Sequence, residues 1–260
     1  MRYFESHAHF DDNRFGKDRH EVLKSCKEAG VECIINAGAD LKSSKKGIEL
    51  ASRYDFVYAA VGVHPHSAKT LSEDSFRDLM NLVKSPKVVA IGEIGLDFHY
   101  DHSPRDVQRL WFVCQMELAK ECNLPVVIHS REASEETFHI VKNANLSDRK
   151  GRGAGVVHCY SGSFEMALKF VELGYFIGIA GPVTYKNARK LVETVEKIPT
   201  ERILIETDCP YLSPEPFRGK RNDSQNLKYI CEKISEIKQI PVEKIAEITL
   251  ENGRKLFDIK

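Results

Sequence analysis

The sequence has no long hydrophobic run, and this absence limits where the protein can reside. A membrane-spanning helix needs about 20 apolar residues, and no segment of the 260-residue chain approaches that length. The first residues carry charge at Arg2 and Glu5 and include no apolar stretch of the kind found in signal peptides. We therefore expect a cytoplasmic protein that does not bind membranes.

The chain also lacks a net charge. Lysine plus arginine and aspartate plus glutamate each number 38, so the formal charge at pH 7 is +0. This balance excludes a protein that attracts nucleic acid through a general basic field. Any polyanionic ligand would have to be held by a local group of cations.

Paired cysteine motifs are absent as well. The seven cysteines form no Cys-x-x-Cys pair, and their odd number does not fit a disulfide framework, so we expect reduced thiols. The sequence contains no low-complexity tract, long linker or solenoid-like repeat. The simplest organisation is one domain over residues 1–260, and nothing indicates an obligate protein partner.

Short segments rich in valine, isoleucine, phenylalanine and tyrosine alternate with longer charged segments of helical periodicity. The predicted strands are residues 2–6, 32–38, 56–63, 88–95, 125–130, 154–159, 175–181 and 202–208. The predicted helices are residues 17–29, 42–53, 72–84, 104–122, 133–144, 164–173, 185–196, 224–238 and 241–257. Eight strands each followed by a helix indicate an α/β protein with a single (β/α)8 TIM barrel. A doubly wound open sheet is the alternative, because it shows the same alternation.

Potential metal ligands gather where the predicted strands end. They are His7, His9, His64, His66, Glu93, His129, His158 and Asp208. In a closed barrel the carboxyl ends of the strands converge on one face, so residues far apart in the chain can surround one centre. These side chains exceed the needs of one ion, and a carboxylate such as Glu93 can bridge two ions about 3.5–4 Å apart. The pattern indicates a dinuclear site.

The donor types restrict the metal. Imidazole ligands suit Zn, Mn, Co, Ni or Fe, whereas Mg would need a carboxylate-rich position. Cys159 and Cys209 directly follow ligand candidates, but neighbouring strand residues point to opposite faces, so we expect both thiols to turn away from the centre. The expected cofactor is therefore two divalent ions without thiolate ligands, and the identity of the ions stays open.

Arginines near the same barrel face could hold phosphate. The segment PYLSPEPFRGKRND (210–223) follows the last predicted strand and contains Arg218 and Arg221, at a position where barrels often bind phosphate. Arg131 lies two residues after His129 and would reach over the same mouth. The planar fork of arginine matches the geometry of phosphate oxygens. These side chains are the local cations that a phosphate ligand of a neutral protein would need.

Seven motifs cover nearly the whole chain. In order they are SHAHFDD, VGVHPH, GEIGLDFHY, VIHSR, VVHCYSG, ETDCPYLSPEPFRGKRN and ENGRKLF. Together they resemble the TatD family of metal-dependent hydrolases. The resemblance implies an amidohydrolase-type TIM barrel with a two-metal site. It also implies a deoxyribonuclease that acts 3′-to-5′ on DNA, single-stranded or at frayed ends, with RNA as a substrate of some members.

The resemblance also assigns metal ligands by position. His7, His9 and Asp208 would hold one metal, His129 and His158 the other, and Glu93 would bridge the two. His64 would lie beside the centre. Two positions depart from the family pattern, because Glu5 replaces the usual aspartate and Asp223-Ser224 replaces the usual Glu-Pro. Neither departure is at a ligand position.

The expected chemistry is hydrolysis by an activated water. The predicted catalytic residues are Asp208, Glu93 and His64, and the predicted substrate-binding residues are Arg131, Arg218 and Arg221. Asp208 would orient the water, and the second metal, or His64 if protonated, would stabilise the departing 3′ oxygen. Asp97 could accept a hydrogen bond from a metal-bound imidazole. The alternative function is an amide or ester hydrolase of the same barrel type, such as a D-aminoacyl-tRNA deacylase or a lactonase. A non-catalytic binding protein is disfavoured, because six unpaired polar groups at one mouth would cost folding stability.

Overall fold

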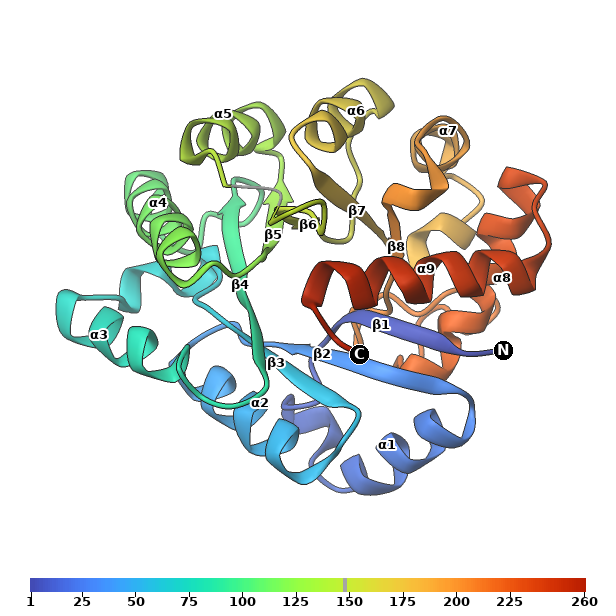
Figure 1. Cartoon of the computed structure of the whole chain (residues 1–260), viewed down its shortest axis with the longest axis horizontal. Helices are drawn as coiled ribbons and strands as arrows, with labels where there is room; N and C mark the ends of the chain where they lie inside the picture. The colour runs from blue at the N-terminus through green and yellow to red at the C-terminus, as the bar shows by residue number, and fades with distance from the viewer. Residues whose placement is uncertain (147–148) are drawn as a thin grey trace.

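The computed structural model describes residues 1–146 and 149–260, which form an eight-stranded parallel barrel (Figure 1). The strands are β1 (Tyr3–Ala8), β2 (Val31–Ala37), β3 (Val57–Val61), β4 (Val88–Asp97), β5 (Val126–Arg131), β6 (Gly155–Val157), β7 (Tyr175–Ile179) and β8 (Ile203–Ile205). Each strand pairs in parallel with its neighbours in the chain, in the order β1 to β8. All carboxyl ends therefore lie at one end of the barrel, which we call the mouth.

The barrel closes between β8 and β1, just beyond the regular part of β8. Ala8 forms a parallel bridge with Cys209. The backbone N–H of Asp208 donates to the carbonyl of His7 (3.0 Å), and that of His9 donates to the carbonyl of Cys209 (2.8 Å). An open sheet would leave both of these edges unpaired. The predicted TIM barrel is therefore confirmed, and the doubly wound alternative is wrong.

Helices cover the outside of the barrel (Figure 1). In the described residues they are α1 (Arg19–Glu28), α2 (Leu41–Arg53), α3 (Glu73–Leu82), α4 (Arg105–Cys122), α5 (Ser134–Ala144), α6 (Phe164–Glu172), α7 (Arg189–Lys197), α8 (Leu227–Lys238) and α9 (Val242–Phe257). Their order matches the sequence-based prediction. Helices α7 and α8 start furthest from the prediction, four and three residues late. Residues 185–188 form a turn between the 3-10 helix Gly181–Thr184 (η3) and α7, and the 3-10 helix Ser224–Asn226 (η5) precedes α8.

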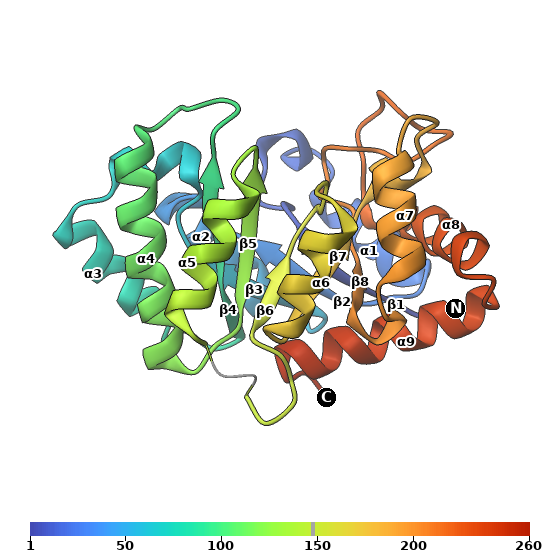
Figure 2. The same ribbon diagram turned by 90° about the horizontal axis from the view of Figure 1, so that it is seen from above.

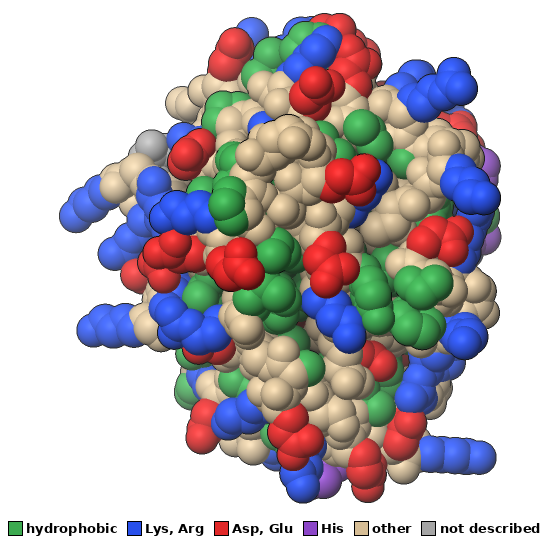
Figure 3. All heavy atoms as spheres, turned by 90° about the vertical axis from the view of Figure 1, so that its right-hand side faces the viewer, with side chains coloured by type: hydrophobic (Ala, Val, Ile, Leu, Met, Phe, Trp, Pro, Cys, Tyr) green, Lys and Arg blue, Asp and Glu red, His purple; other side chains and the backbone are tan. Residues whose placement is uncertain are grey.

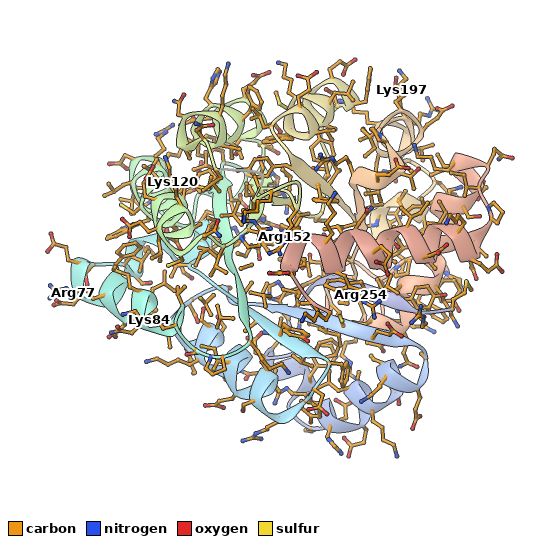
Figure 4. All side chains as sticks on the ribbon, viewed as in Figure 1. Arg77, Lys84, Lys120, Arg152, Lys197 and Arg254 are labelled. Carbon is orange, nitrogen blue, oxygen red and sulfur yellow. The ribbon has the colours of Figure 1, made fainter. Side chains whose placement is uncertain are left out.

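Helix α9 closes the end of the barrel opposite the mouth (Figure 2). The ring of Phe257 stacks on that of Phe4 in β1, with centroids 5.7 Å apart and planes 5° apart. Gly253 allows this close approach, because a Cβ atom there would lie 2.4 Å from Phe4 Cγ. Arg254, labelled in Figure 4, pairs with Glu32 of β2 at 2.8 Å. These contacts connect the last helix of the chain to its first strands.

Four strands end two or three residues earlier than predicted. They end at Val61 (β3), Val157 (β6), Ile179 (β7) and Ile205 (β8), whereas the predicted ends are residues 63, 159, 181 and 208. After β6 and β8 the backbone turns at the mouth. Cys159 and Asp208 adopt left-handed backbone conformations, with φ of 43° and 54°. A strand cannot continue through such residues, so the segments that carry the polar side chains leave the sheet at this point.

The outer surface carries charges of both signs. On the face shown in Figure 3, lysine and arginine side chains are interspersed with aspartate and glutamate. This distribution agrees with the equal numbers of cationic and anionic residues in the sequence. Within residues 1–146 and 149–260, no helix has both the length and the apolar composition that crossing a membrane would require.

Candidate metal centre

The structure brings the six predicted metal ligands together at the mouth. They are His7, His9, Glu93, His129, His158 and Asp208. His7 lies in β1 and His9 directly after it, Glu93 and His129 lie in β4 and β5, and His158 and Asp208 lie in the segments after β6 and β8. Because the barrel closes, residues from the two ends of the chain become neighbours. The parallel strands thus build the site from five separate segments.

His7, His9 and Asp208 form the first ligand group. The two Nε2 atoms of the histidines lie 3.1 Å apart. Asp208 Oδ1 lies 3.6 Å from His7 Nε2 and 3.3 Å from His9 Nε2. Ligand atoms about 2.0–2.1 Å from a tetrahedrally coordinated ion lie roughly 3.3 Å from one another. The spacing of these three side chains therefore fits one divalent ion.

Glu93, His129 and His158 form the second ligand group. Glu93 Oε1 lies 2.9 Å from His129 Nδ1 and 2.7 Å from His158 Nε2, and these two nitrogens are 3.3 Å apart. The other carboxylate oxygen, Glu93 Oε2, faces the first group, at 3.4 Å from His7 Nε2 and 3.6 Å from His9 Nε2. One carboxylate thus offers one oxygen to each group, which is the arrangement of a bridging ligand.

The electrostatics of the centre also fit bound cations. Burial would raise the pKa of Glu93, but the surrounding histidines, His158 above all, outweigh burial and hold this pKa well below its ordinary value. The carboxylate is therefore ionised at neutral pH. Two imidazole nitrogens 3.1 Å apart cannot both carry protons directed at each other, so a lone pair must face the first group. Imidazole and carboxylate donors in this combination suit divalent transition metals.

Outer partners orient the imidazole rings. His9 Nδ1 donates to the carbonyl of Ala37 at 2.9 Å, which directs the Nε2 lone pair to the first group. His129 Nε2 donates to Asp97 Oδ2 at 3.0 Å and leaves Nδ1 for the second group. His158 Nδ1 lies 3.4 Å from Glu206 Oε1. Asp97 is among the residues predicted from the sequence, whereas Glu206 is not. Glu206 lies two residues before Asp208, and because residues i and i+2 of a strand share a face, this spacing could have indicated it.

Asp97→Ala is expected to weaken metal binding about 10–100-fold, because His129 would lose the carboxylate that orients its ring. Calorimetric titration of metal-free protein measures this change. Asp101→Ala is the matched control, since Asp101 lies in the loop that follows Asp97 and pairs with Arg105 instead. Equal metal affinity of Asp97→Ala and the wild type would contradict this role.

His64 lies beside the second group as a hydrogen-bond donor. Its Nδ1 accepts the backbone N–H of His66 at 3.1 Å, so the proton of the neutral ring is on Nε2. This Nε2 lies 3.4 Å from Glu93 Oε1. Burial lowers the pKa of His64 to about 4 despite the nearby Glu93, so the ring is neutral at pH 7. It can therefore donate a hydrogen bond without carrying a charge.

The three predicted substrate-binding arginines occupy different surroundings. Arg131 lies over the ring of Tyr100, with its guanidinium carbon 4.7 Å from the ring centroid. Arg218 lies over Tyr185 in the same way, at 4.3 Å. Arg221 instead donates two hydrogen bonds to Asp18, at 2.8 and 2.6 Å. A phosphate would have to compete with Asp18 for Arg221, whereas no carboxylate pairs with Arg131 or Arg218 among the ion pairs of the described residues.

The two departures from the family pattern meet in space. Glu5 is fully buried, and its Oε2 accepts hydrogen bonds from the hydroxyls of Ser224 (2.8 Å) and Thr207 (2.5 Å). Its Oε1 accepts the backbone N–H of Thr207 (2.8 Å). A proline at position 224 would have no hydroxyl for this contact. Glu5 and Ser224 therefore connect β1 to the segment after β8, directly below His7 and Asp208.

The two cysteines beside the ligands belong to different environments. Cys209 is fully buried, whereas Cys159 is partly exposed and lines a pocket at the mouth. Strand alternation cannot orient Cys159, because β6 has already ended. Neither sulfur belongs to the groups of close ligand atoms found in the described residues.

Comparison with known proteins decides the family. A family profile described as TatD related DNase matches residues 4–258. The chain belongs to the TatD-related DNase family. The resemblance of its seven motifs is thereby confirmed, and the protein is a metal-dependent hydrolase of this nuclease family.

Relatives of this TatD-family hydrolase align over nearly their full length. The uncharacterised metal-dependent hydrolase YabD of Bacillus subtilis is 43% identical over 98% of this chain and 99% of its own. The 3′-5′ ssDNA/RNA exonuclease TatD of a Rahnella species is 35% identical, over 98% and 97%. The crystal structure of the TatD homologue YjjV from Escherichia coli K12 superimposes with a TM-score of 0.93 at 33% identity, over 99% of this chain and 98% of the other.

Proposed function

We propose that this TatD-family hydrolase is a two-metal-ion 3′-to-5′ exonuclease that removes nucleotides from single-stranded or frayed DNA ends and can also accept RNA. The two oxygens of Glu93, each facing a separate ligand group, are the observation that carries the two-ion part of this proposal. The proposed substrate is supported by the relative named as a 3′-5′ ssDNA/RNA exonuclease. Arginines at the mouth supply local positive charge in a neutral protein.

In this proposal His7, His9 and Asp208 would hold one ion, His129 and His158 the other, and Glu93 both. The distances within the two ligand groups support this division. Zn, Mn, Co and Ni suit the imidazoles, and Mg would suit the carboxylates. When bound, the ions supply a water that ionises near pH 7 and neutralise charge on the scissile phosphate.

Asp208 and His64 have the proposed proton-handling roles. Burial opposes ionisation of Asp208, but the neighbouring His9 and His7 lower its pKa, so the carboxylate can orient the attacking water and accept its proton. The water attacks phosphorus, and the bond to the 3′ oxygen of the preceding nucleotide breaks. The Nε2–H of His64 donates a hydrogen bond to this departing oxygen. The products are a 5′-mononucleotide and a shortened strand.

An amide or ester hydrolase, such as a D-aminoacyl-tRNA deacylase or a lactonase, is the alternative for the same barrel. The activated water would then attack a carbonyl carbon. Two features favour phosphate. The β4 ligand is Glu93 and not a lysine, and Arg218 has no evident use for a neutral amide. Incubation of the Mg-, Mn- or Zn-loaded protein with single-stranded DNA and with amide and ester substrates tests the choice. Cleavage of amides or esters without nucleotide release would overturn the proposal.

Arg218→Ala is expected to raise KM for DNA and to reduce the salt dependence of binding by about one counterion, because one phosphate contact is lost. Metal content and hydrolysis of a small phosphodiester should not change. Arg221→Ala should act in the same direction but more weakly, because Asp18 already occupies Arg221. Lys197→Ala is the control, since Lys197 projects from the outer ring at α7 (Figure 4). Loss of metal from Arg218→Ala would contradict the assignment.

We further propose that residues 1–260 act as one domain, since α9 packs against β1 and β8. The cytoplasmic location and the lack of an obligate protein partner stay predictions from the sequence.

A further inference from the structure

A pocket of about 590 Å³ opens beside the metal centre. Its lining residues come from the segment that follows β6 and from η3 to the start of α7. They include Cys159, Tyr160, Tyr185, Asn187, Ala188 and Leu191. The metal-binding role assigned to the centre uses none of these side chains.

Aromatic rings and small apolar groups make up the inner part of this pocket. The hydroxyl of Tyr160 donates to the carbonyl of Ser163 at 2.6 Å, and that of Tyr185 donates to the carbonyl of Ser213 at 2.9 Å. Both hydroxyls are therefore satisfied by backbone, and the two rings are fixed. Leu191 adds a buried aliphatic side chain. A pocket of this size and composition fits a planar, largely apolar ligand with few polar groups.

The pocket shares a wall with the second ligand group. Cys159 directly follows His158, and its backbone N–H donates to Glu206 Oε1 at 2.5 Å. The same oxygen lies 3.4 Å from His158 Nδ1. A group bound against Cys159 would thus lie beside the residue that follows the proposed metal ligand His158 in the chain.

Cations surround the opening of the pocket. Arg189 and Lys190 are exposed lining residues at the start of α7, and Arg218 covers the ring of Tyr185 at 4.3 Å. An apolar interior with a cationic rim is complementary to a nucleotide, which joins a planar base to an anionic phosphate. A free hydrophobic ligand would have no use for this rim.

We propose that the pocket holds the nucleobase of the terminal nucleotide during cleavage; this assignment rests on the proposed exonuclease function. A base must leave its stack to enter a pocket, and a terminal base breaks one stacking contact whereas an internal base breaks two. The pocket therefore makes strand ends the preferred substrates. It is sequence-tolerant, because aromatic rings stack on any base.

The test uses single-stranded oligonucleotides with an abasic residue at the 3′-terminal or at the penultimate position. For the wild type, the terminal abasic residue is expected to lower kcat/KM roughly 5- to 150-fold, the range for losing one stacked base. The penultimate abasic residue should have little effect. Ala188→Trp should fill the pocket, lower kcat/KM for normal DNA by a similar factor, and bring the ratio between normal and terminally abasic DNA close to one. Hydrolysis of a small phosphodiester should be unchanged.

Asn187→Trp places a large ring at the neighbouring, exposed lining position and is expected to act like Ala188→Trp. Lys186→Trp is the matched control, because Lys186 is exposed in the same segment but does not line the pocket. The assignment would be overturned if both pocket variants still discriminated fully against terminally abasic DNA. It would also be overturned if only the penultimate abasic residue lowered kcat/KM of the wild type. In both cases DNA is still shortened, so the exonuclease proposal survives. Failure of the wild type to shorten any DNA would overturn both proposals.

Discussion

Glu93→Ala is expected to cause the largest loss of activity of any single substitution in this chain. Both oxygens of Glu93 face ligand groups, so the substitution removes a ligand from each group at once. A pair of ions contributes several kcal/mol to transition-state stabilisation, and its loss corresponds to a decrease in kcat of about 10³-fold or more. Metal analysis of the purified variant should find fewer than two ions per chain.

Glu132→Ala is the control for this substitution. Glu132 also follows a barrel strand, but it is exposed and pairs with His99 at 2.7 Å. Its removal should leave metal content and kcat close to those of the wild type. If Glu93→Ala kept two ions and normal turnover, the mouth would be arranged differently from the geometry described above.

Asp208→Asn is expected to give the second largest loss, about 10²- to 10⁴-fold in kcat, the usual range for a general base. The amide keeps the volume and one oxygen of the carboxylate, so the first ligand group loses charge but not shape. It cannot accept a proton from water. Steady-state kinetics on DNA should therefore show a fall in kcat that excess metal does not restore.

Asp12→Asn provides the comparison for Asp208→Asn. Asp12 lies near the same mouth, where it accepts a hydrogen bond from Tyr211, but it belongs to neither ligand group. Its substitution should leave kcat nearly unchanged. Full recovery of Asp208→Asn activity at high metal concentration would mean that Asp208 only binds metal.

Much of the fold and the ligand set could be predicted because each depends on local patterns. Alternation of apolar strands with helices gave the number and order of the elements, and parallel strands place all their carboxyl ends together. The positions of His7 and Asp208 at opposite ends of the chain therefore sufficed to predict that they meet. The ends of β6 and β8 were harder to predict from the sequence, because left-handed residues such as Cys159 interrupt strands without a compositional signal.

Contacts between distant segments were the part that the sequence could not provide. Glu5 and Ser224 are separate departures in the sequence, and only the closed barrel brings them to 2.8 Å. Likewise, Glu206 belongs to a predicted strand, and the sequence does not show that its carboxylate lies 3.4 Å from His158 and accepts a hydrogen bond from the backbone of Cys159. Arg221 is of a residue type that binds phosphate, yet it pairs with Asp18, and this pairing depends on the folding of two loops onto each other.

The central claim is that Glu93 joins two metal ions in one working site. Stepwise titration of chelator-treated protein with Mn or Zn, with activity on single-stranded DNA measured at each step, tests it most directly. Two ions should bind per chain, and activity should rise only as the second ion binds. Full activity with one ion per chain, or activity that persists without any ion, would contradict it.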